Sequence, residues 1–169
     1  LFVDGDDRLS TAEALRLIDK RIVEYNEDII LYRFSKSTHS KELIIRKEYD
    51  LDIINKHNKS VTLKWLINNN CMPYATWISC IRKSVVWDKN LHFKRGIVGE
   101  DFDWALQTLN AAESIGALND ILYTYIEREG SLSSFSSVQS VKGLSYAISH
   151  WLSTRNRSCE LDSYLVKIF

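Results

Sequence analysis

The sequence has little of the residues that mark collagen-like, disulfide-rich or disordered proteins. Its 169 residues include one proline, six glycines and three cysteines. So little proline and glycine argues against a fibrous or low-complexity chain. The cysteines (Cys71, Cys80 and Cys159) are odd in number, widely spaced and without a CxxC pair, which is not the pattern of a disulfide framework or a zinc site. We expect reduced, mostly buried thiols in a cytosolic compartment.

An excess of charge of one sign and long apolar runs are also missing. Lysine and arginine together number 22, as do aspartate and glutamate, so the formal net charge is zero. This balance argues against a protein that binds nucleic acid through a strong positive field, and we expect no nucleic-acid partner. No run of about 18 apolar residues occurs, so the sequence predicts no membrane-spanning helix. The four histidines are scattered and lack metal-ligand spacing.

What is present is typical of one compact domain. The chain is 45% hydrophobic and 26% charged, and its length is sufficient for a sizeable core. It opens with the apolar residues 1–3 and reaches a cluster of aspartates at once. We interpret this opening as the end of a buried strand whose sheet neighbours are missing, and we expect the chain to be part of a longer protein.

Hydrophobic patterns predict helices mixed with strands. A capping box from Ser10 to Glu13 would start the first helix, and Ser60 would cap a later one. Gly116 would end another helix, and the Ser-rich residues 130–140 predict a loop. Strands mixed with helices make the fold α/β or α+β, with the strand order open. The predicted helices cover residues 11–26, 61–68, 82–90, 101–114, 143–153 and 160–168, and the predicted strands cover residues 28–34, 42–49, 74–81 and 117–126.

Three groups of residues carry candidate chemistry, and the first is the sequence FVDGDD at residues 2–7. An apolar strand that ends in D-x-D-D brings carboxylates to the edge of a sheet where open α/β proteins bind ligands. Clustered carboxylates repel one another, and hard cations such as Mg²⁺ or Mn²⁺ prefer these oxygen ligands together with substrate phosphates. The alternative is an Asp-rich turn before a helix, where negative charge is favourable.

The other two groups lie later in the chain. In GEDFDW at residues 99–104, Glu100 and Asp101 open a predicted helix, where a carboxylate stays ionised at neutral pH, as a general base must. After the Y-x-Y sequence at residues 123–125, a strand ends near Arg128, whose guanidinium suits phosphate oxygens. The plain alternatives are an acidic helix N-terminus and a solvated charged edge.

Together these groups resemble the family 2 glycosyltransferases of bacteria. The resemblance lies in the order of D-x-D-D, then G-E-D-x-x-W, then Y-x-Y followed by an arginine and G-S, and it extends from Phe2 to about Ser134. Residues 2–7 resemble the metal-binding DxD strand end of that family, and Glu100-Asp101 resembles its ED pair. The further matches are residues 73–77, 81–84 and 91–93, which resemble the acceptor-side stretch, and residues 130–133, which resemble the G-S-I-S loop.

The resemblance implies an α/β fold of the GT-A type, a mixed sheet flanked by helices, present here as an incomplete C-terminal portion. Residues 1–135 would form the metal- and acceptor-side part of the domain, and residues 136–169 a C-terminal helical extension. The nucleotide-binding part that precedes the DxD motif in the family is not in this sequence. We therefore expect little or no activity from this chain alone.

The implied reaction moves a sugar from a nucleotide-diphospho sugar onto an acceptor hydroxyl with inversion. A divalent cation would neutralise the diphosphate, and a carboxylate would take the proton of the acceptor hydroxyl. Trp104 is expected in the core because it lies at helical spacing with other apolar residues. The implied site residues are Asp6, Asp4 and Asp7 for Mg²⁺ or Mn²⁺, Asp101 as catalytic base with Glu100 in support, and Asp4, Arg128 and Trp77 for substrate.

The resemblance also implies partners and a location. The donor would be a nucleotide-diphospho sugar, and the acceptor a carbohydrate or a lipid-linked saccharide. Members of the family commonly build bacterial surface polysaccharides, which implies a cytoplasmic protein at the inner face of the cell membrane. Peripheral membrane association and a homodimer are left open.

Two alternatives come from other functional classes. A haloacid dehalogenase-type phosphohydrolase also has a nucleophilic Asp after an apolar strand, but Arg8 replaces its usual Thr or Val, and only residues 96–98 precede the distal acidic motif. A non-catalytic binding module derived from a transferase fold is the other alternative. Within the family itself, Ile126 stands where an Arg is common, so Arg128 is the one diphosphate-binding candidate of that stretch.

Overall fold

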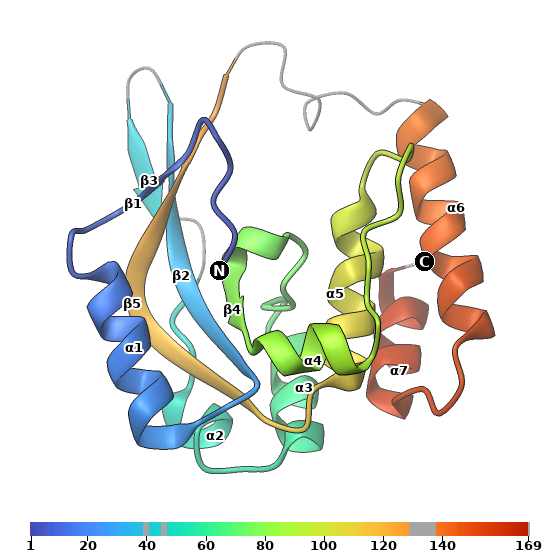
Figure 1. Cartoon of the computed structure of the whole chain (residues 1–169), viewed down its shortest axis with the longest axis horizontal. Helices are drawn as coiled ribbons and strands as arrows, with labels where there is room; N and C mark the ends of the chain where they lie inside the picture. The colour runs from blue at the N-terminus through green and yellow to red at the C-terminus, as the bar shows by residue number, and fades with distance from the viewer. Residues whose placement is uncertain (39–40, 45–46, 129–137, 169) are drawn as a thin grey trace.

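A computed structural model describes residues 1–38, 41–44, 47–128 and 138–168. These residues form a mixed sheet with helices on both sides (Figure 1). The strands are β1 (Arg8–Leu9), β2 (Ile29–Ser37), β3 (Glu42–Ile44), β4 (Ser79–Ile81) and β5 (Ile115–Ile126). The helices are α1 (Ala14–Tyr25), α2 (Leu51–Ile54), α3 (Lys59–Asn68), α4 (Lys83–Asp88), α5 (Glu100–Ala111), α6 (Val138–Ser153) and α7 (Cys159–Ile168), with a 3-10 turn η1 (Thr76–Ile78).

The sheet is built on the parallel pair of β2 and β5. The register runs from Ile29 beside Ile115 to Ser37 beside Ile126, with irregularities around Arg33. The short β1 is antiparallel to β5, while β3 and β4 both pair antiparallel with β2, at its carboxyl and amino halves respectively. Parallel strands end at the same edge of a sheet, so this arrangement defines one carboxyl edge for β2 and β5.

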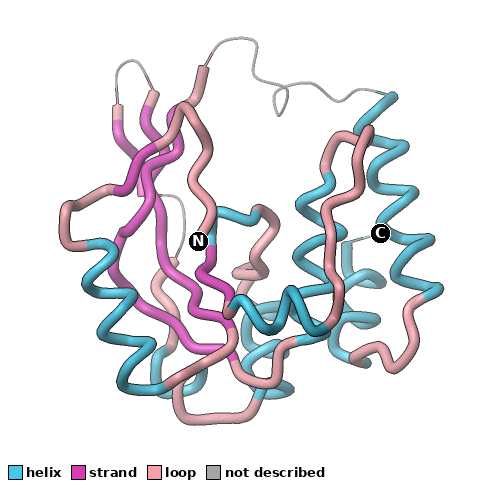
Figure 2. Tube along the Cα trace, in the orientation of Figure 1, coloured by secondary structure: helices cyan, strands magenta, loops and turns pink. Residues whose placement is uncertain are grey.

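Loops from two distant parts of the chain reach this carboxyl edge. Figure 2 shows the loop before β1 and the loop before α5 both rising toward the end of the molecule where β2 and β5 finish. In open α/β sheets, ligands bind beyond the carboxyl ends of the strands. The fold therefore brings the two predicted acidic motifs to the side of the sheet where a ligand is expected.

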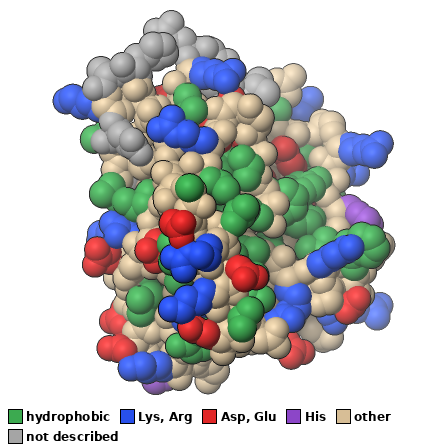
Figure 3. Space-filling model, turned by 60° about the vertical axis from the view of Figure 1, so that its left-hand side comes forward, with side chains coloured by type: hydrophobic (Ala, Val, Ile, Leu, Met, Phe, Trp, Pro, Cys, Tyr) green, Lys and Arg blue, Asp and Glu red, His purple; other side chains and the backbone are tan. Residues whose placement is uncertain are grey.

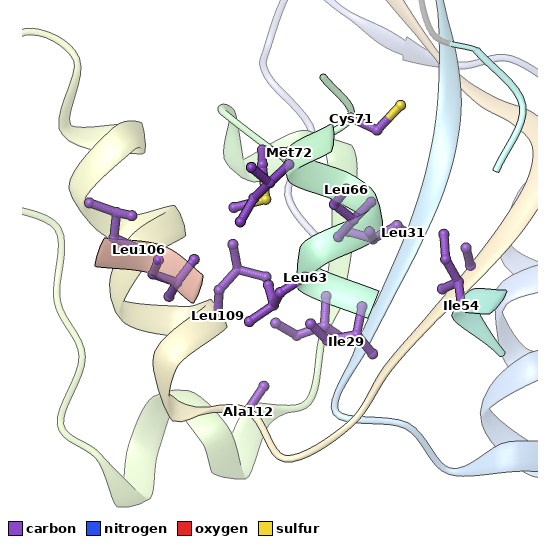
Figure 4. Close-up of a cluster of buried hydrophobic side chains, with 14 of the residues drawn as sticks. Ile29, Leu31, Ile54, Leu63, Leu66, Cys71, Met72, Leu106, Leu109 and Ala112 are labelled. Carbon is purple, nitrogen blue, oxygen red and sulfur yellow. The ribbon is translucent and has the colours of Figure 1, made fainter. Parts of the chain in front are cut away.

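Each face of the sheet is covered by its own hydrophobic cluster. On one face, Ile29 and Leu31 of β2 pack with apolar residues of α3, α5, α6 and α7. Figure 4 shows part of this cluster, where Leu63 of α3 and Leu109 of α5 lie close to Ile29. On the other face, Phe34 packs with residues of α1 and η1. Residues of α6 and α7, among them Trp151, Leu161 and Leu165, belong to the first cluster, so these two helices share its core.

Several predicted elements are confirmed, and others need correction. The strands at residues 28–34 and 117–126 and the helices at residues 11–26 and 101–114 correspond to β2, β5, α1 and α5. The predicted strand over residues 74–81 is wrong for its first half, which forms η1. The predicted strand over residues 42–49 is confirmed for Glu42–Ile44 and wrong for residues 47–49, which have no regular structure, while residues 45 and 46 lie outside the described residues. The loop predicted over residues 130–140 also falls largely outside the described residues, and α6 begins at Val138.

The predicted caps of two helices, Ser10 and Ser60, were wrong because other contacts occupy their side chains. Glu13, without a side-chain capping bond, is the N-cap of α1, while the Ser10 hydroxyl bonds the Thr124 hydroxyl at 2.9 Å. Helix α3 is capped by Asn58, whose side chain accepts a hydrogen bond from the Val61 amide at 3.1 Å. A serine hydroxyl near the start of a helix therefore does not cap it when the hydroxyl hydrogen-bonds to a neighbouring element instead.

Gly116, which was predicted to end a helix, lies within a strand. There it leaves room for a buried ion pair. Gly116 lies in β5 beside Ile30 of β2. A Cβ at Gly116 would lie 2.3 Å from the Glu27 carboxylate, which pairs with Arg21 of α1. Both charged side chains are nearly buried, so the glycine provides the space in which the pair fits.

The surface beside α1 carries charges of both signs. Figure 3 shows acidic and basic side chains intermixed on this face, with apolar side chains between them. The exposed apolar residues of α1 include Leu15 and Val23. Among the described residues, no helix is long and apolar enough to cross a membrane.

Candidate functional site

The aspartate-rich turn is attached to the carboxyl half of β5. The Asp7 amide donates to the Asp4 carbonyl at 3.1 Å, which closes the turn. The Asp7 carboxylate accepts one hydrogen bond from the Tyr123 hydroxyl at 2.7 Å and another from the Ile126 amide at 2.8 Å. Both oxygens of Asp7 therefore hold the turn on the sheet. The residues before the turn do not form the predicted strand, because residues 1–4 have no regular structure.

Asp4 lies near the other carboxylates of the acidic group. Its amide donates to the Tyr123 hydroxyl at 3.1 Å, so one tyrosine binds both ends of the turn. Partial burial of the carboxyl, followed by the charges of Asp7, Asp6 and Glu100, raises the pKa of Asp4. A carboxylate surrounded by others in this way is stabilised by a nearby cation.

Asp6 lies beside the predicted phosphate-binding arginine. The Arg128 Nε lies 3.5 Å from an Asp6 carboxylate oxygen, and both side chains are substantially exposed. An exposed pair at this distance contributes little to stability. Asp6 and Arg128 are therefore free to exchange this contact for a ligand at low cost.

The predicted catalytic pair begins α5. Gly99 is the N-cap residue, and its φ of 84° lies in the left-handed region that favours glycine. Glu100 and Asp101 follow in the first helical turn, where the unpaired amides stabilise negative charge. The sequence therefore predicts the start of this helix almost correctly.

The environment of Asp101 links it to the aspartate-rich turn. Burial is the main cause that raises the pKa of Asp101, and the charges of Glu100 and Asp4 add to it. Thr76 opposes this effect, because its hydroxyl and its backbone amide both hydrogen-bond to the Asp101 carboxylate. Glu100 acts on Asp4, and Asp4 acts on Asp101, so the two motifs form one acidic site although about 95 residues of sequence separate them.

An aromatic stack backs the acidic site from the sheet side. The Trp77 ring stacks on Tyr123 at 4.7 Å between centroids and on Tyr125 at 5.6 Å, and Phe34 contacts its ring edge-on. Trp77 is 7% exposed, so little of its ring is open to a substrate. Its role in substrate binding stays a prediction, and its described contacts are those of a core residue.

A second aromatic group connects the chain start to α5. Trp104 stacks on Phe93 at 4.1 Å, and Phe2 contacts both rings edge-on. Trp104 is 5% exposed, which confirms the prediction that it lies in the core. Phe2 stands two residues before Asp4, and Trp104 stands three residues after Asp101, so this group holds the two motifs near each other.

The donor set suits a cation that a substrate also binds. Among the described residues, no group of three or more His, Cys, Asp or Glu side chains could hold a metal ion. Mg²⁺, however, is commonly bound by one or two carboxylates together with substrate phosphates. Asp4 and Asp6 fit this chemistry, because the oxygens of Asp7 already hold the turn.

Two residues of the site were not identified as site residues from the sequence. Tyr123 and Thr76 act through hydrogen bonds to Asp7 and Asp101, which are far away in the chain. The signal for Tyr123 was the Y-x-Y sequence at residues 123–125, and for Thr76 it was the likeness of residues 73–77 to the acceptor-side stretch. The predicted Gly-Ser loop at residues 130–133 lies outside the described residues.

Comparison with known proteins identifies the fold. No protein-family model matches the sequence, and no curated protein sequence does. Solved structures do match. S. aureus TarS 1–349 in complex with UDP-GlcNAc aligns with a TM-score of 0.71 and 20% identity over 99% of this chain and 46% of that chain. TarS 1–349 in complex with UDP aligns with a TM-score of 0.67 and 18% identity, again over 99% of this chain and 44% of that chain.

A further structure, of longer S. aureus TarS, gives a TM-score of 0.66 with 19% identity over 99% of this chain and 27% of that chain. The chain therefore spans less than half the length of the TarS structures that it matches. At this identity the likeness shows the fold alone. The chain has an α/β, GT-A-like fold like that of these TarS structures, with a mixed sheet flanked by helices, and it matches less than half of TarS 1–349.

Proposed function

We propose that the protein is a glycosyltransferase that moves a sugar from a nucleotide-diphospho sugar to an acceptor hydroxyl with inversion. The observation that carries the proposal is the contact of Phe2 with Trp104, which brings the aspartate-rich turn to the start of α5, where Asp4 and Glu100 raise the pKa of Asp101. This site lies at the edge of the sheet where open α/β folds bind ligands. The fold shared with TarS supports the same reading.

Asp101 is the proposed catalytic base. It takes the proton of the acceptor hydroxyl while the acceptor oxygen attacks the anomeric carbon and the bond to the nucleotide diphosphate breaks. Thr76 keeps the carboxylate oriented and favours its ionised form, against the burial that raises its pKa. Glu100 supports Asp101 from the same helical turn.

Asp4 and Asp6 are the proposed metal ligands, with Asp7 holding the turn that presents them. Bound Mg²⁺ or Mn²⁺ supplies positive charge that stabilises the departing diphosphate. Arg128 lies beside Asp6 and is the proposed contact for a phosphate oxygen. We likewise propose that the protein is a family 2 glycosyltransferase and that residues 4–6 are its metal-binding DxD motif.

The proposed donor is a UDP-sugar, and UDP-GlcNAc is the first to test because TarS structures contain UDP-GlcNAc and UDP. We further propose a carbohydrate or lipid-linked saccharide acceptor, in bacterial surface polysaccharide synthesis at the cytoplasmic face of the membrane. Because the chain spans less than half of TarS 1–349, the 169 residues alone are expected to transfer little sugar.

The test is UDP release from UDP-GlcNAc by the full-length protein with Mn²⁺ or Mg²⁺, in the presence of candidate acceptors. We expect release to stop when EDTA removes the metal. Asp101→Asn should abolish transfer and retain UDP-GlcNAc binding, measured by calorimetry, because the base is lost and the donor contacts remain. Asp120→Asn, the same change at an exposed position of β5, is the matched control. Full transfer by Asp101→Asn contradicts the assignment of the base.

The alternatives predict other results in the same assays. Hydrolysis of a phosphate monoester that Asp4→Asn abolishes would favour a haloacid dehalogenase-type phosphohydrolase. A full-length protein that binds neither UDP-GlcNAc nor metal would favour a non-catalytic module.

A further inference from the structure

We propose that α6 is a positioning element for the Glu100–Asp101 pair, and that Gly143 and His150 are its positioning residues. This inference rests on the proposed function of that pair. Helix α6 contacts the chain on both sides of the pair, at Val98 in the loop before α5 and at Asp103 in the first turn of α5. The two contacts are of different kinds and support the inference independently.

The first contact is between backbones. A Cβ added at Gly143 would lie 1.9 Å from the Val98 carbonyl oxygen and 3.0 Å from its carbonyl carbon. The neighbour is backbone and not the end of a flexible side chain, so no side-chain rotation would relieve the overlap. Gly143 therefore lets α6 press directly against the residue before Gly99, which is the N-cap of α5.

The second contact is a buried carboxylate bound by a histidine. His150 Nδ1 lies 2.8 Å and 3.0 Å from the two oxygens of Asp103. Asp103 is 3% exposed and stands in the first turn of α5, two residues after Asp101. A buried carboxylate needs such a partner, because losing it leaves an unpaired buried charge.

The two contacts enclose the catalytic pair. Val98 and Asp103 are separated by Gly99, Glu100, Asp101 and Phe102, and each end of this short stretch is fixed by α6. The left-handed conformation of Gly99 lies within the stretch, so the direction of the first turn depends on where its two ends are held. Helix α6 therefore acts on the pair through its contacts with Val98 and Asp103.

The position of α6 affects the rate of the proposed reaction, because reacting groups tolerate little displacement. A misplacement of about 1 Å is enough to reduce a rate about 100-fold. In Gly143→Ala the methyl group forces α6 and Val98 apart, and Asp101 moves with the loop. The described contacts of Asp4 and Asp6 are with Tyr123 and Arg128 and not with α6, so we expect the effect in kcat and not in the KM for the donor.

The experiment compares four variants of the full-length protein. Gly143→Ala and His150→Leu should each reduce kcat between about 10-fold and about 100-fold with the KM for UDP-GlcNAc unchanged. His150→Asn should restore most of kcat, because its side-chain amide can donate to Asp103 from nearly the same place. Ser145→Ala, at an exposed position of α6, controls for a change of helix propensity.

Hydrogen exchange at residues 99–103 gives a readout that does not need activity. We expect faster exchange there in Gly143→Ala and His150→Leu than in Ser145→Ala, with His150→Asn close to the wild-type protein. Unchanged kcat and unchanged exchange in Gly143→Ala would overturn the inference, as would a rise in KM without a fall in kcat. If the wild-type protein transfers no sugar, the proposed function fails, while the exchange measurement still decides whether α6 holds the pair.

Discussion

Tyr123 shows how one buried hydroxyl can organise a site made of carboxylates. It accepts from the Asp4 amide and donates to the Asp7 carboxylate, at 3.1 and 2.7 Å. Burial is the main cause that raises the pKa of Tyr123, and the adjacent Asp7 raises it further, so the hydroxyl keeps its proton at all physiological pH values. The position of Asp4 and Asp6 thus depends on a residue that sequence spacing does not connect to them.

We predict that Tyr123→Phe weakens metal-dependent UDP-GlcNAc binding about 10-fold and lowers the free energy of unfolding by about 1 to 2 kcal/mol. The ring keeps its stacking on Trp77, so the change isolates the two hydrogen bonds. Calorimetry with and without Mn²⁺ and urea unfolding measure the two effects. Tyr25→Phe, at an exposed position of α1, should change neither quantity. Wild-type binding by Tyr123→Phe would show that the turn is held by other contacts.

Thr76 lowers the pKa of Asp101 against the larger effect of burial, and we predict a pH effect when its hydroxyl is removed. The hydroxyl lowers the pKa of Asp101 while burial raises it, so Thr76→Val should raise that pKa. A base must be ionised to act, and the acidic limb of kcat against pH should therefore move to higher pH. Thr76→Ser keeps the hydroxyl and should leave the limb in place. An unmoved or downward-shifted limb in Thr76→Val would contradict this account.

At the scale of elements, helix α7 is attached to the start of α3 through a carboxylate. Glu160 accepts hydrogen bonds from Ser60 at 2.5 Å and Ser158 at 2.7 Å. These two bonds are the main reason that the pKa of Glu160 falls to about 2. Ser60 is thus occupied by α7, which explains why Asn58 caps α3 instead.

We predict that Glu160→Gln lowers the free energy of unfolding by about 1 kcal/mol at pH 7. The folded pKa lies below the ordinary value of 4.5, so the contribution of Glu160 is complete above pH 4.5 and is lost as the pH falls toward 2. The difference between the two proteins should therefore shrink across that range in urea unfolding. Glu24→Gln, in an exposed pair with Lys20, is the control with little expected effect. A difference that stays constant down to pH 2 would argue against the assigned bonds.

Element types could largely be predicted from the sequence, and element ends could not. Residues 28–34 are rich in residue types that favour strands, and residues 101–114 have the apolar spacing of a helix. In the structure these segments form β2 and α5, so their local preferences agree with the fold. The ends depend on partners far away in the chain, such as Thr124 for Ser10 and Glu160 for Ser60. The acidic residues of the site could be found because their clustering is local, whereas the contact of Thr76 with Asp101 could not, since it exists only in the fold.

At the scale of the whole molecule, the sheet and the two last helices share one hydrophobic core. Trp151 of α6 is fully buried and donates a hydrogen bond from Nε1 to Asp162 of α7 at 2.8 Å. It belongs to the same cluster as Ile29 of β2 and Leu109 of α5. The division into a metal- and acceptor-side part (residues 1–135) and a C-terminal helical extension (residues 136–169) stays a prediction, while these contacts predict joint unfolding.

We predict that Trp151→Ala lowers the free energy of unfolding by about 3 to 5 kcal/mol and that the wild-type protein unfolds in one transition. Removing the buried indole would leave a large cavity between α6, α7 and the core beneath them. Coincident curves from far-ultraviolet circular dichroism and tryptophan fluorescence in urea measure the transition. Two separate transitions in the wild-type protein, with α6 and α7 melting first, would show that these helices form an independent unit.

The parallel pairing of β2 and β5 has a consequence for how the chain is made. Its first register pair joins Ile29 to Ile115, and all of α2, α3, α4 and α5 lie between them. Contacts between residues so distant in sequence form slowly, because a long loop must close first. During synthesis, β2 therefore emerges from the ribosome well before its parallel partner exists. We expect this nascent strand to depend on its antiparallel neighbours β3 and β4, or on a chaperone, until β5 has been translated.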